Sequence, residues 1–229
     1  YTPSGTSDQG SRLGPSSTNL LHDKGLSTEI GWQDTDAKGN SLSGERRQQM
    51  RRLRQWNERF QRRSSTDRNL MHALGEINRM ASALGVPDSA RETAGAVYRR
   101  ALRDGLLPGR AVESVATAAL YAASRIDGTP RSLDEVSTVS RVEQIRVERA
   151  YRQLSRELEL EIAPTDPRSF IGRIASDVEF TDATEREARR LAGAAVENGV
   201  HSGKHQVGIA AGALYAAAKR CDESLRQAD

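Results

Sequence analysis

The stretch ALYAASR at residues 119–125 returns as ALYAAAK at residues 213–219, and this duplication decides the fold. Each copy follows a glycine and a basic residue at the same distance, Gly109-Arg110 in the first copy and Gly203-Lys204 in the second. The offset of 94 residues also holds further upstream, across three consecutive helical segments and without a gap. A match of this length at one fixed offset indicates two homologous domains in tandem.

The duplicated segment is rich in alanine and has the periodicity of a helix. From Val112 to Ala123, small and aliphatic residues recur every three or four positions, which places them in one apolar stripe. Small side chains permit close approach of neighbouring helices, so we expect this helix to be the central one of its repeat. Tyr121 and Tyr215 are expected to be core residues with satisfied hydroxyl groups.

Helix-breaking sequences divide the first repeat into five helices, and no segment shows the alternation typical of a strand. Ser132-Leu133-Asp134-Glu135 has the pattern of a capping box, which starts a short helix. After a turn near Ser140, a fifth helix is predicted over residues 143–160. The sequence therefore predicts an all-α protein. The breaks are Gly85 to Asp88, Asp104-Gly105, Pro108-Gly109 and Asp127 to Pro130.

The second repeat is expected to be incomplete. Ser224 and the residues after it are similar to the start of the short capped helix at Ser132, and the residues that would finish the repeat are not in this sequence. Upstream of the repeats, the first residues are rich in Ser, Thr, Gly and Pro and have little to bury. We divide the chain into a largely irregular arm at 1–43, a basic linker helix at 44–63, a first repeat at 64–163 and a truncated second repeat at 164–229.

The composition excludes several classes of protein. The 229 residues are 28% charged, with a mean hydropathy of -0.66. There is no apolar run of about 18 residues, the length that a transmembrane helix needs. No signal peptide is visible at the start. The single cysteine, Cys221, excludes an intrachain disulfide framework and a Cys-rich zinc site within these residues.

Excess positive charge is confined to the first quarter of the chain. The net charge is +3, and residues 1–63 alone carry +4, while the two repeats are close to neutral. Only four of the 34 basic residues are Lys. Arg suits the recognition of phosphate or carboxylate because its planar fork binds both, but a GC-rich genome would also favour Arg codons.

Within this basic region, residues 44–63 also have a narrow apolar stripe at helical spacing. A basic helix with such a stripe fits a surface for nucleic acid or an acidic partner. The same pattern fits an ordinary solvated amphipathic helix, and the pattern by itself leaves both open. The stripe consists of Met50, Leu53, Trp56 and Phe60.

Several motifs, taken in order with the double repeat, resemble a known family over almost the whole chain. They are Ser11 to Gly14, Leu21 to Gly31, Met50 to Trp56, Gly109-Arg110, and Ser132 to Val136 with Val139 to Val142. In this series the chain is similar to archaeal transcription factor B, the counterpart of eukaryotic transcription factor IIB. Gln33-Asp34 and residues 80–87 resemble its halophilic branch. The resemblance implies two tandem cyclin-like five-helix repeats, preceded by a flexible arm.

The resemblance further implies a general transcription initiation factor and not an enzyme. Members of this family bridge the TATA-binding protein on promoter DNA to RNA polymerase, and they aid polymerase recruitment, promoter opening and start-site selection. The implied partners are therefore the TATA-binding protein, promoter DNA at the TATA box and flanking element, and RNA polymerase. A cytoplasmic, nucleoid-associated location follows if the source is archaeal.

The resemblance assigns three groups of residues to these partners. DNA contacts are implied for Arg141, Gln144, Arg149, Arg152 and Lys204. Contacts with the acidic stirrup of the TATA-binding protein are implied for Gly109, Arg110 and Arg125. Roles at the polymerase cleft and in promoter opening are implied for Arg12, Leu13, Gly14, His22, Asp23, Lys24, Gly25, Arg51, Arg52, Arg54 and Trp56.

No cofactor is predicted for this chain, because the family places its zinc ribbon before the residues matched here. His201 and His205 are four residues apart but lack further ligands, so a surface or capping role is predicted. Two other functions are weighed. A cyclin-type regulatory subunit of a kinase would suit the helical repeats, but it needs neither the basic helix nor the arm at Arg12. An enzyme on a helical scaffold would need a nucleophile constellation or a phosphate loop, and the sequence shows neither.

Overall fold

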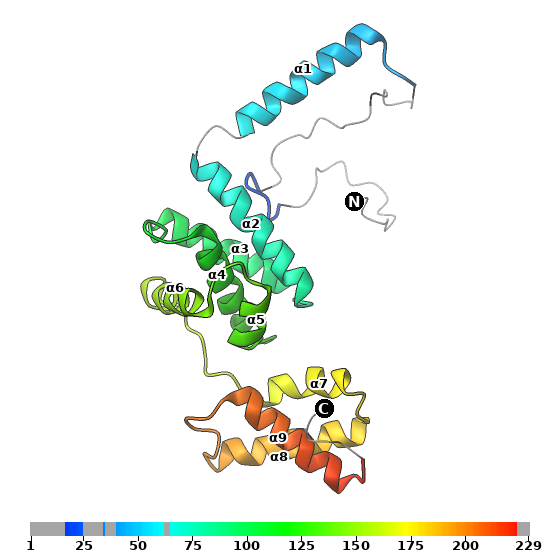
Figure 1. Cartoon of the computed structure of the whole chain (residues 1–229), viewed down its shortest axis with the longest axis vertical. Helices are drawn as coiled ribbons and strands as arrows, with labels where there is room; N and C mark the ends of the chain where they lie inside the picture. Colours follow the sequence, from blue (N-terminus) through cyan, green and yellow to red (C-terminus); the bar gives the residue numbers. More distant parts are fainter. Residues whose placement is uncertain (1–16, 25–33, 35–39, 62–64, 224–229) are drawn as a thin grey trace. The chain divides into compact units, whose positions relative to one another are not determined.

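The computed structural model describes residues 17–24, 34, 40–61 and 65–223, and its regular structure over these residues is helical (Figure 1). The all-α fold predicted from the sequence is confirmed. The helices are α1 (Gly44–Gln61), α2 (Ser65–Ala83), α3 (Asp88–Arg103), α4 (Val112–Ile126), α5 (Leu133–Val139), α6 (Gln144–Glu157), α7 (Arg168–Asp177), α8 (Asp182–Glu197) and α9 (Gln206–Arg220).

These helices fall into two units, which are described separately. The first unit, Tyr1–Leu74, contains α1 and the first half of α2. The second unit, Gly75–Asp229, contains the rest of α2 and all of α3 to α9. The finer division into an arm, a linker helix and two repeats stays a prediction. No helix in the described part of the chain combines the length and apolar character needed to cross a membrane.

The duplication is visible helix by helix in the second unit. α3 and α8 have the same length, and their first and last residues are each 94 positions apart; the same is true of α4 and α9. Gly109 and Gly203 occupy equivalent positions ahead of α4 and α9, with φ of +78° and +71°. A left-handed backbone cannot belong to a right-handed helix, so α4 and α9 begin three residues later than these glycines. Gly109 and Gly203 therefore lie in the loops before these helices.

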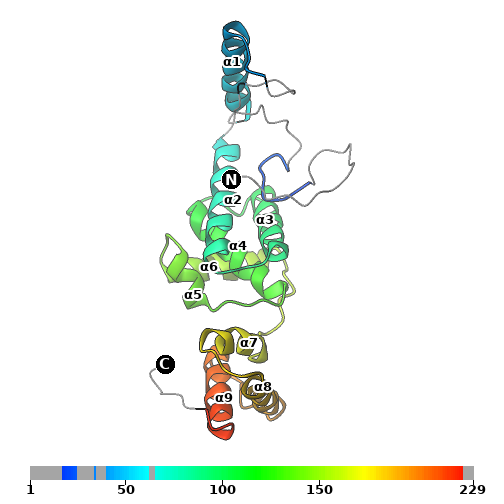
Figure 2. The same cartoon turned by 90° about the vertical axis from the view of Figure 1, so that its right-hand side faces the viewer.

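α4 is the central helix of the first repeat, as its small residues predicted. It packs against α3, α5 and α6 (Figures 1 and 2). Ala116, Ala119, Leu120 and Ala123 are all fully buried. Alanine at these positions lets the neighbouring helices approach closely, which explains why one helix can serve three partners.

The prediction that Tyr121 and Tyr215 belong to the core is wrong, because both are only half-buried. The fully buried tyrosine is Tyr98 on α3. Burial, followed by the carboxylate of Glu113, raises the pKa of the Tyr98 hydroxyl well above its ordinary value. Helical spacing alone placed Tyr121 next to the core stripe, but its ring points to the edge of the helix bundle, where it meets Tyr151 at 4.8 Å between ring centroids.

The capping box predicted at the start of α5 is confirmed. The backbone amide of Glu135 donates to Ser132 Oγ at 3.1 Å, and the amide of Ser132 donates to Glu135 Oε2 at 2.6 Å. Burial acts to raise the pKa of the Glu135 carboxyl, but the bonds from Ser132 and the charge of Arg173 outweigh it and lower that pKa. The carboxylate form is therefore the stabilising one.

Replacing Glu135 with glutamine is expected to lower the free energy of unfolding by about 1 kcal/mol near neutral pH. Because folding lowers the pKa of Glu135, its contribution is present above the unfolded-state pKa and is lost as the pH falls through the folded-state pKa. Thermal unfolding followed by circular dichroism should therefore show a difference near neutral pH that shrinks as the pH falls through the folded-state pKa of Glu135. Ser132→Ala removes a hydroxyl that also helps to lower the pKa of Glu135, so its deficit should shrink in acid as well. A Glu135→Gln deficit that survives acidification would contradict the electrostatic origin.

In the second repeat, α7, α8 and α9 enclose a core of their own around Phe170, Ile171 and Leu214. The face of α9 away from this core differs from α4, because Ala211 and Gly212 are exposed while the equivalent residues of α4 are buried. In the first repeat α5 and α6 cover this face. Among the described residues, no helix follows α9 in the second repeat.

Candidate nucleic-acid and protein interface

α5 and α6 form a helix-turn-helix whose turn, residues 140–143, is pinned to the centre of the repeat. Ser140 Oγ lies 2.9 Å from Thr117 Oγ1 on α4, and it accepts the backbone amide of Val142 at 3.3 Å. Thr117 is buried and also donates to the carbonyl of Glu113 at 2.7 Å. A turn fixed to the central helix holds the first residues of α6 in one direction.

Four of the five predicted DNA contacts lie on this helix-turn-helix, and all four are exposed. Arg141 lies in the turn, with its side chain 60% exposed. Gln144 begins α6 and donates from Nε2 to Asp134 Oδ1 of α5 at 2.9 Å. Arg149 and Arg152 lie on the outer face of α6, and Arg152 pairs with Glu148 at 3.0 Å. The structure thus brings these four together on one element, while the DNA contact itself stays a prediction.

The fifth predicted DNA contact, Lys204, belongs to the second repeat. It is exposed and directly precedes His205, the N-cap residue of α9. No side chain makes a capping hydrogen bond at the start of this helix. The location fits a phosphate contact, but Lys204 stands just outside the helix and not in its first turn.

Arg110 lies in the loop before α4 and is exposed. Its Nη1 is 3.3 Å from the carbonyls of both Leu106 and Pro108, so the side chain folds over its own loop. These are long bonds to neutral acceptors, and no carboxylate among the described residues forms a recorded ion pair with Arg110. The guanidinium can therefore exchange these bonds for a partner's carboxylate at low cost.

Arg125, the third predicted contact with the TATA-binding protein, is engaged within the chain. Nη1 donates to the hydroxyl of Tyr151 at 2.6 Å, and Nη2 donates to the carbonyl of Ala163 at 2.9 Å. Its guanidinium also lies within 6 Å of the rings of Tyr121 (5.9 Å) and Tyr151 (5.8 Å). Arg125 thus anchors the segment that follows α6, a structural role that sequence reasoning missed.

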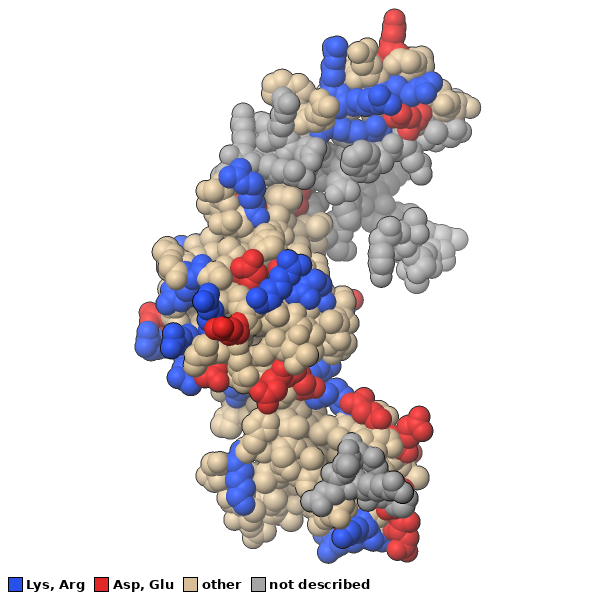
Figure 3. Space-filling view, in the orientation of Figure 1, with Lys and Arg blue, Asp and Glu red and all other residues tan. Residues whose placement is uncertain are grey.

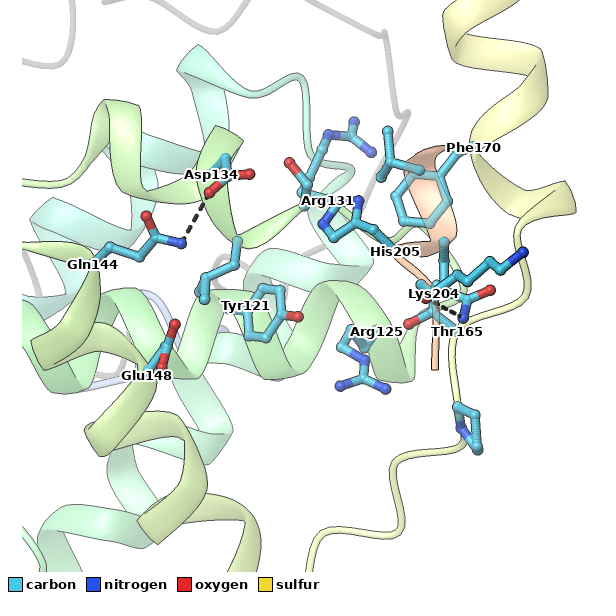
Figure 4. A pocket seen from close by; sticks show the side chains of 15 residues that line it. Tyr121, Arg125, Arg131, Asp134, Gln144, Glu148, Thr165, Phe170, Lys204 and His205 are labelled. Atoms are coloured by element: carbon cyan, nitrogen blue, oxygen red, sulfur yellow. Dashed lines mark hydrogen bonds between the residues drawn. The ribbon is translucent and has the colours of Figure 1, made fainter. Parts of the chain in front are cut away.

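A pocket of about 580 Å³ opens beside this arginine, and Figure 4 shows its lining. It brings Arg125 together with two predicted DNA contacts, Gln144 and Lys204. Carboxylates of Asp134 and Glu148 line it as well, so the pocket mixes both signs of charge. Within the described residues no group of three potential ligands could hold a metal ion.

Two further arginines, Arg173 and Arg131, form contacts near the start of α5. Arg173 of α7 forms a two-pronged ion pair with Glu135, the residue of the capping box. Arg131 donates from Nε and Nη2 to the carbonyls of Leu84 and Gly85, at 3.0 and 3.1 Å. Burial, followed by the charge of Arg173, lowers the pKa of Arg131. Neither arginine could be assigned from sequence, because their partners lie 38 and more residues away.

The basic character predicted for residues 44–63 is seen on the surface of α1, where Figure 3 shows a dense run of blue side chains, all of them Arg in this helix. Arg51 and Arg52 are exposed. Arg54 is different, because it is only 14% exposed and pairs with Asp34 at 3.0 Å. The apolar stripe is open to solvent, with Leu53 45% and Trp56 68% exposed. An apolar stripe of this kind is available to a partner.

Part of the predicted arm can also be located. His22 Nδ1 lies 3.9 Å from Asp23 Oδ1. Lys24 has a left-handed backbone, φ +59°, and its amide donates to the carbonyl of Leu21 at 2.9 Å, which closes a turn. The predicted residues Arg12, Leu13, Gly14 and Gly25 lie outside the described residues.

The histidine prediction is borne out only in part. His205 occupies the N-cap position of α9, but its side chain makes no capping hydrogen bond. His201 lies at the turn before it, and its carbonyl accepts the Gln206 side chain at 3.4 Å. His205 is exposed, so of the predicted surface or capping role the surface role fits it.

Two tandem helical repeats, the first of which ends in an exposed helix-turn-helix, define the class of double cyclin-like repeat proteins. The profile of the transcription factor TFIIB repeat matches residues 66–157 and 161–229, and the chain belongs to the transcription initiation factor IIB family. This family consists of general transcription initiation factors, which are not enzymes, so the enzyme alternative is set aside.

Relatives from archaea support the same family. The chain is 59% identical over 220 residues to transcription initiation factor IIB 4 of Halobacterium salinarum, covering 96% of this chain and 67% of the relative. It is 57% identical over 222 residues to transcription initiation factor IIB 2 of Haloferax volcanii, covering 97% and 67%. It is 44% identical over 217 residues to transcription initiation factor IIB of Methanosarcina mazei, covering 95% and 64%. The resemblance to archaeal transcription factor B and its halophilic branch is confirmed.

Proposed function

We propose that the chain bridges the TATA-binding protein on promoter DNA to RNA polymerase, and that it uses a different surface for each partner. The helix-turn-helix of α5 and α6 binds DNA beside the TATA box. The loop at Arg110 meets an acidic surface of the TATA-binding protein. The basic helix α1 acts at the polymerase, where the DNA strands separate.

The observation that carries this proposal is the separation of charge along the chain. Residues 1–63 carry a net charge of +4, whereas residues 64–163 carry none and residues 164–229 carry -1. Affinity for DNA depends mainly on the number of phosphates that a protein neutralises. Near-neutral repeats therefore cannot bind promoter DNA tightly by themselves and need a partner that is already bound there.

The exposed apolar side chains of α1 support the proposal that this helix acts at RNA polymerase. A helix whose Leu53 and Trp56 are open to solvent has an unfilled apolar stripe beside its exposed arginines Arg51 and Arg52. A cyclin-type regulator of a kinase would not require this arrangement. The combination fits a protein cleft that also holds DNA.

A gel-shift assay on TATA-containing duplex DNA tests the proposal. The chain alone should bind weakly and without sequence preference, because its repeats carry almost no net charge. Addition of an archaeal TATA-binding protein should produce a stable ternary complex, since that protein bends DNA and lets both repeats reach it. Polymerase should then enter the same complex. Tight, sequence-specific binding of the chain without the TATA-binding protein would contradict this division of labour.

A further inference from the structure

A buried carboxylate lies directly beneath the turn of the helix-turn-helix. Glu76, on α2, is only 6% exposed, although it is charged. Burial of a carboxylate is costly unless cations and hydrogen bonds compensate for it. The contacts of Glu76 therefore indicate what the carboxylate does at this position.

Both oxygens of Glu76 are used, each by a different arginine. Oε2 accepts Nε and Nη2 of Arg79, one turn further along α2, at 3.1 and 2.8 Å. Oε1 lies 3.2 Å from Nη2 of Arg141, which is in the turn between α5 and α6. One carboxylate thus joins α2 to a residue 65 positions away in the sequence.

Neighbouring contacts fix the rest of the turn. Nη2 of Arg79 also donates to the carbonyl of Val139, the last residue of α5, at 2.9 Å. The next residue, Ser140, is held by Thr117 of α4. Three consecutive residues, 139 to 141, are therefore tied to α2 and α4: Val139 through its carbonyl, and Ser140 and Arg141 through their side chains.

Arg141 is held at one end only. Its side chain is 60% exposed, although Nη2 is bound to a carboxylate that is 7% exposed. A guanidinium has five N–H donors arranged in a rigid plane, so fixing one edge directs the remaining donors outward. An arginine held in this way loses less side-chain entropy on binding an anion than a free one does.

We propose that Glu76 is a positioning residue for DNA binding: it clamps the inner edge of the Arg141 guanidinium so that the outer edge meets a backbone phosphate of the promoter. This inference rests on the proposed function and adds to it a residue that does not itself touch DNA. Glu76 acts through Arg141, and its own charge is neutralised by Arg79 and not by the ligand.

A double-mutant cycle in the ternary complex tests the proposal, with affinity measured over a range of salt concentrations. Arg141→Ala should weaken binding about tenfold and reduce the slope of log affinity against log salt by about one. Glu76→Gln should weaken binding about fivefold and leave that slope unchanged, because the cation is still present but no longer aligned. The double variant should bind like Arg141→Ala alone.

Two controls make the result specific. Asp88→Asn removes a fully solvated carboxylate from the same repeat, with its side chain 92% exposed, and should not change the affinity. In the free chain, amide hydrogen exchange over residues 139–143 should be faster in Glu76→Gln than in the wild type. This measurement tests whether Glu76 stabilises the turn when no partner is bound. If Glu76→Gln proves unfolded by circular dichroism, Glu76→Asp keeps the charge, moves it one methylene away from Arg141 and carries the same expectations.

The possible results distinguish a failure of the positioning role of Glu76 from a failure of the proposed function. If the effects of Glu76→Gln and Arg141→Ala add fully, Glu76 acts on the fold and not through Arg141, and the positioning role is overturned. Tighter binding by Glu76→Gln would also overturn it, because the carboxylate would then be masking a cation. If the wild-type chain forms no ternary complex, the proposed function itself is wrong, whatever the exchange measurement shows of the clamp.

Discussion

Replacement of Arg110 with glutamate is expected to weaken assembly with the TATA-binding protein and promoter DNA about a hundredfold, or about 3 kcal/mol. In the proposed complex, the change turns the cation that faces an acidic partner into an anion, so attraction becomes repulsion. The fold should be unaffected, because Arg110 is exposed and its bonds to Leu106 and Pro108 are long and made to neutral carbonyls. Affinity in a gel shift and the melting temperature by circular dichroism are the two measurements.

A matched variant separates this contact from a general effect of charge. Arg68→Glu makes the same change in net charge at another exposed arginine, near the start of α2, and should leave assembly nearly intact. Arg110→Lys keeps the charge but loses the planar guanidinium. The affinity of its complex should therefore lie between those of the wild type and Arg110→Glu. Equal losses for Arg110→Glu and Arg68→Glu would assign the effect to net charge and remove Arg110 from the interface.

The helices and their duplication could be predicted because the signals are local. Breaks such as Gly85 to Asp88 lie within a few residues of the helix ends that they set, and the capping box at Ser132 needs only four consecutive residues. The central position of α4 followed from its small residues. Because the sequence is duplicated, α3 and α4 each have an equivalent helix in the second repeat. The bounds of α8 and α9 match those of α3 and α4.

The candidate site was predicted less completely, because its side chains meet partners that are distant in the sequence. Arg141 could be named from the resemblance, but its anchor Glu76 could not, since only the Glu76–Arg79 pair has a helical spacing. Arg125 was assigned to a partner from the resemblance, yet it binds Tyr151 and Ala163 within the chain. Periodicity places a residue on a face of its helix and says nothing of which distant segment packs there.

The same limit applies to the basic helix, and it changes how that helix must be tested. Arg51, Arg52 and Arg54 are alike in sequence and could be removed together. The structure shows that Arg54 is 14% exposed and pairs with Asp34, so its loss would break an ion pair within the chain as well as remove a surface charge. Arg51 and Arg52 are exposed and can be replaced without that side effect.

Replacing Arg51 and Arg52 together with alanine is therefore expected to reduce transcript yield from a duplex promoter about tenfold, while the ternary complex with the TATA-binding protein forms normally. The helix should persist, because alanine is the best helix former. A premelted promoter should restore the yield to within about twofold of the wild type, since the step that needs these cations has been bypassed. Gln48→Ala with Gln55→Ala, two neutral exposed changes on the same helix, should be silent on both templates. An equal loss on duplex and premelted DNA would mean that Arg51 and Arg52 act in recruitment, and the assignment of α1 to strand separation would have to be given up.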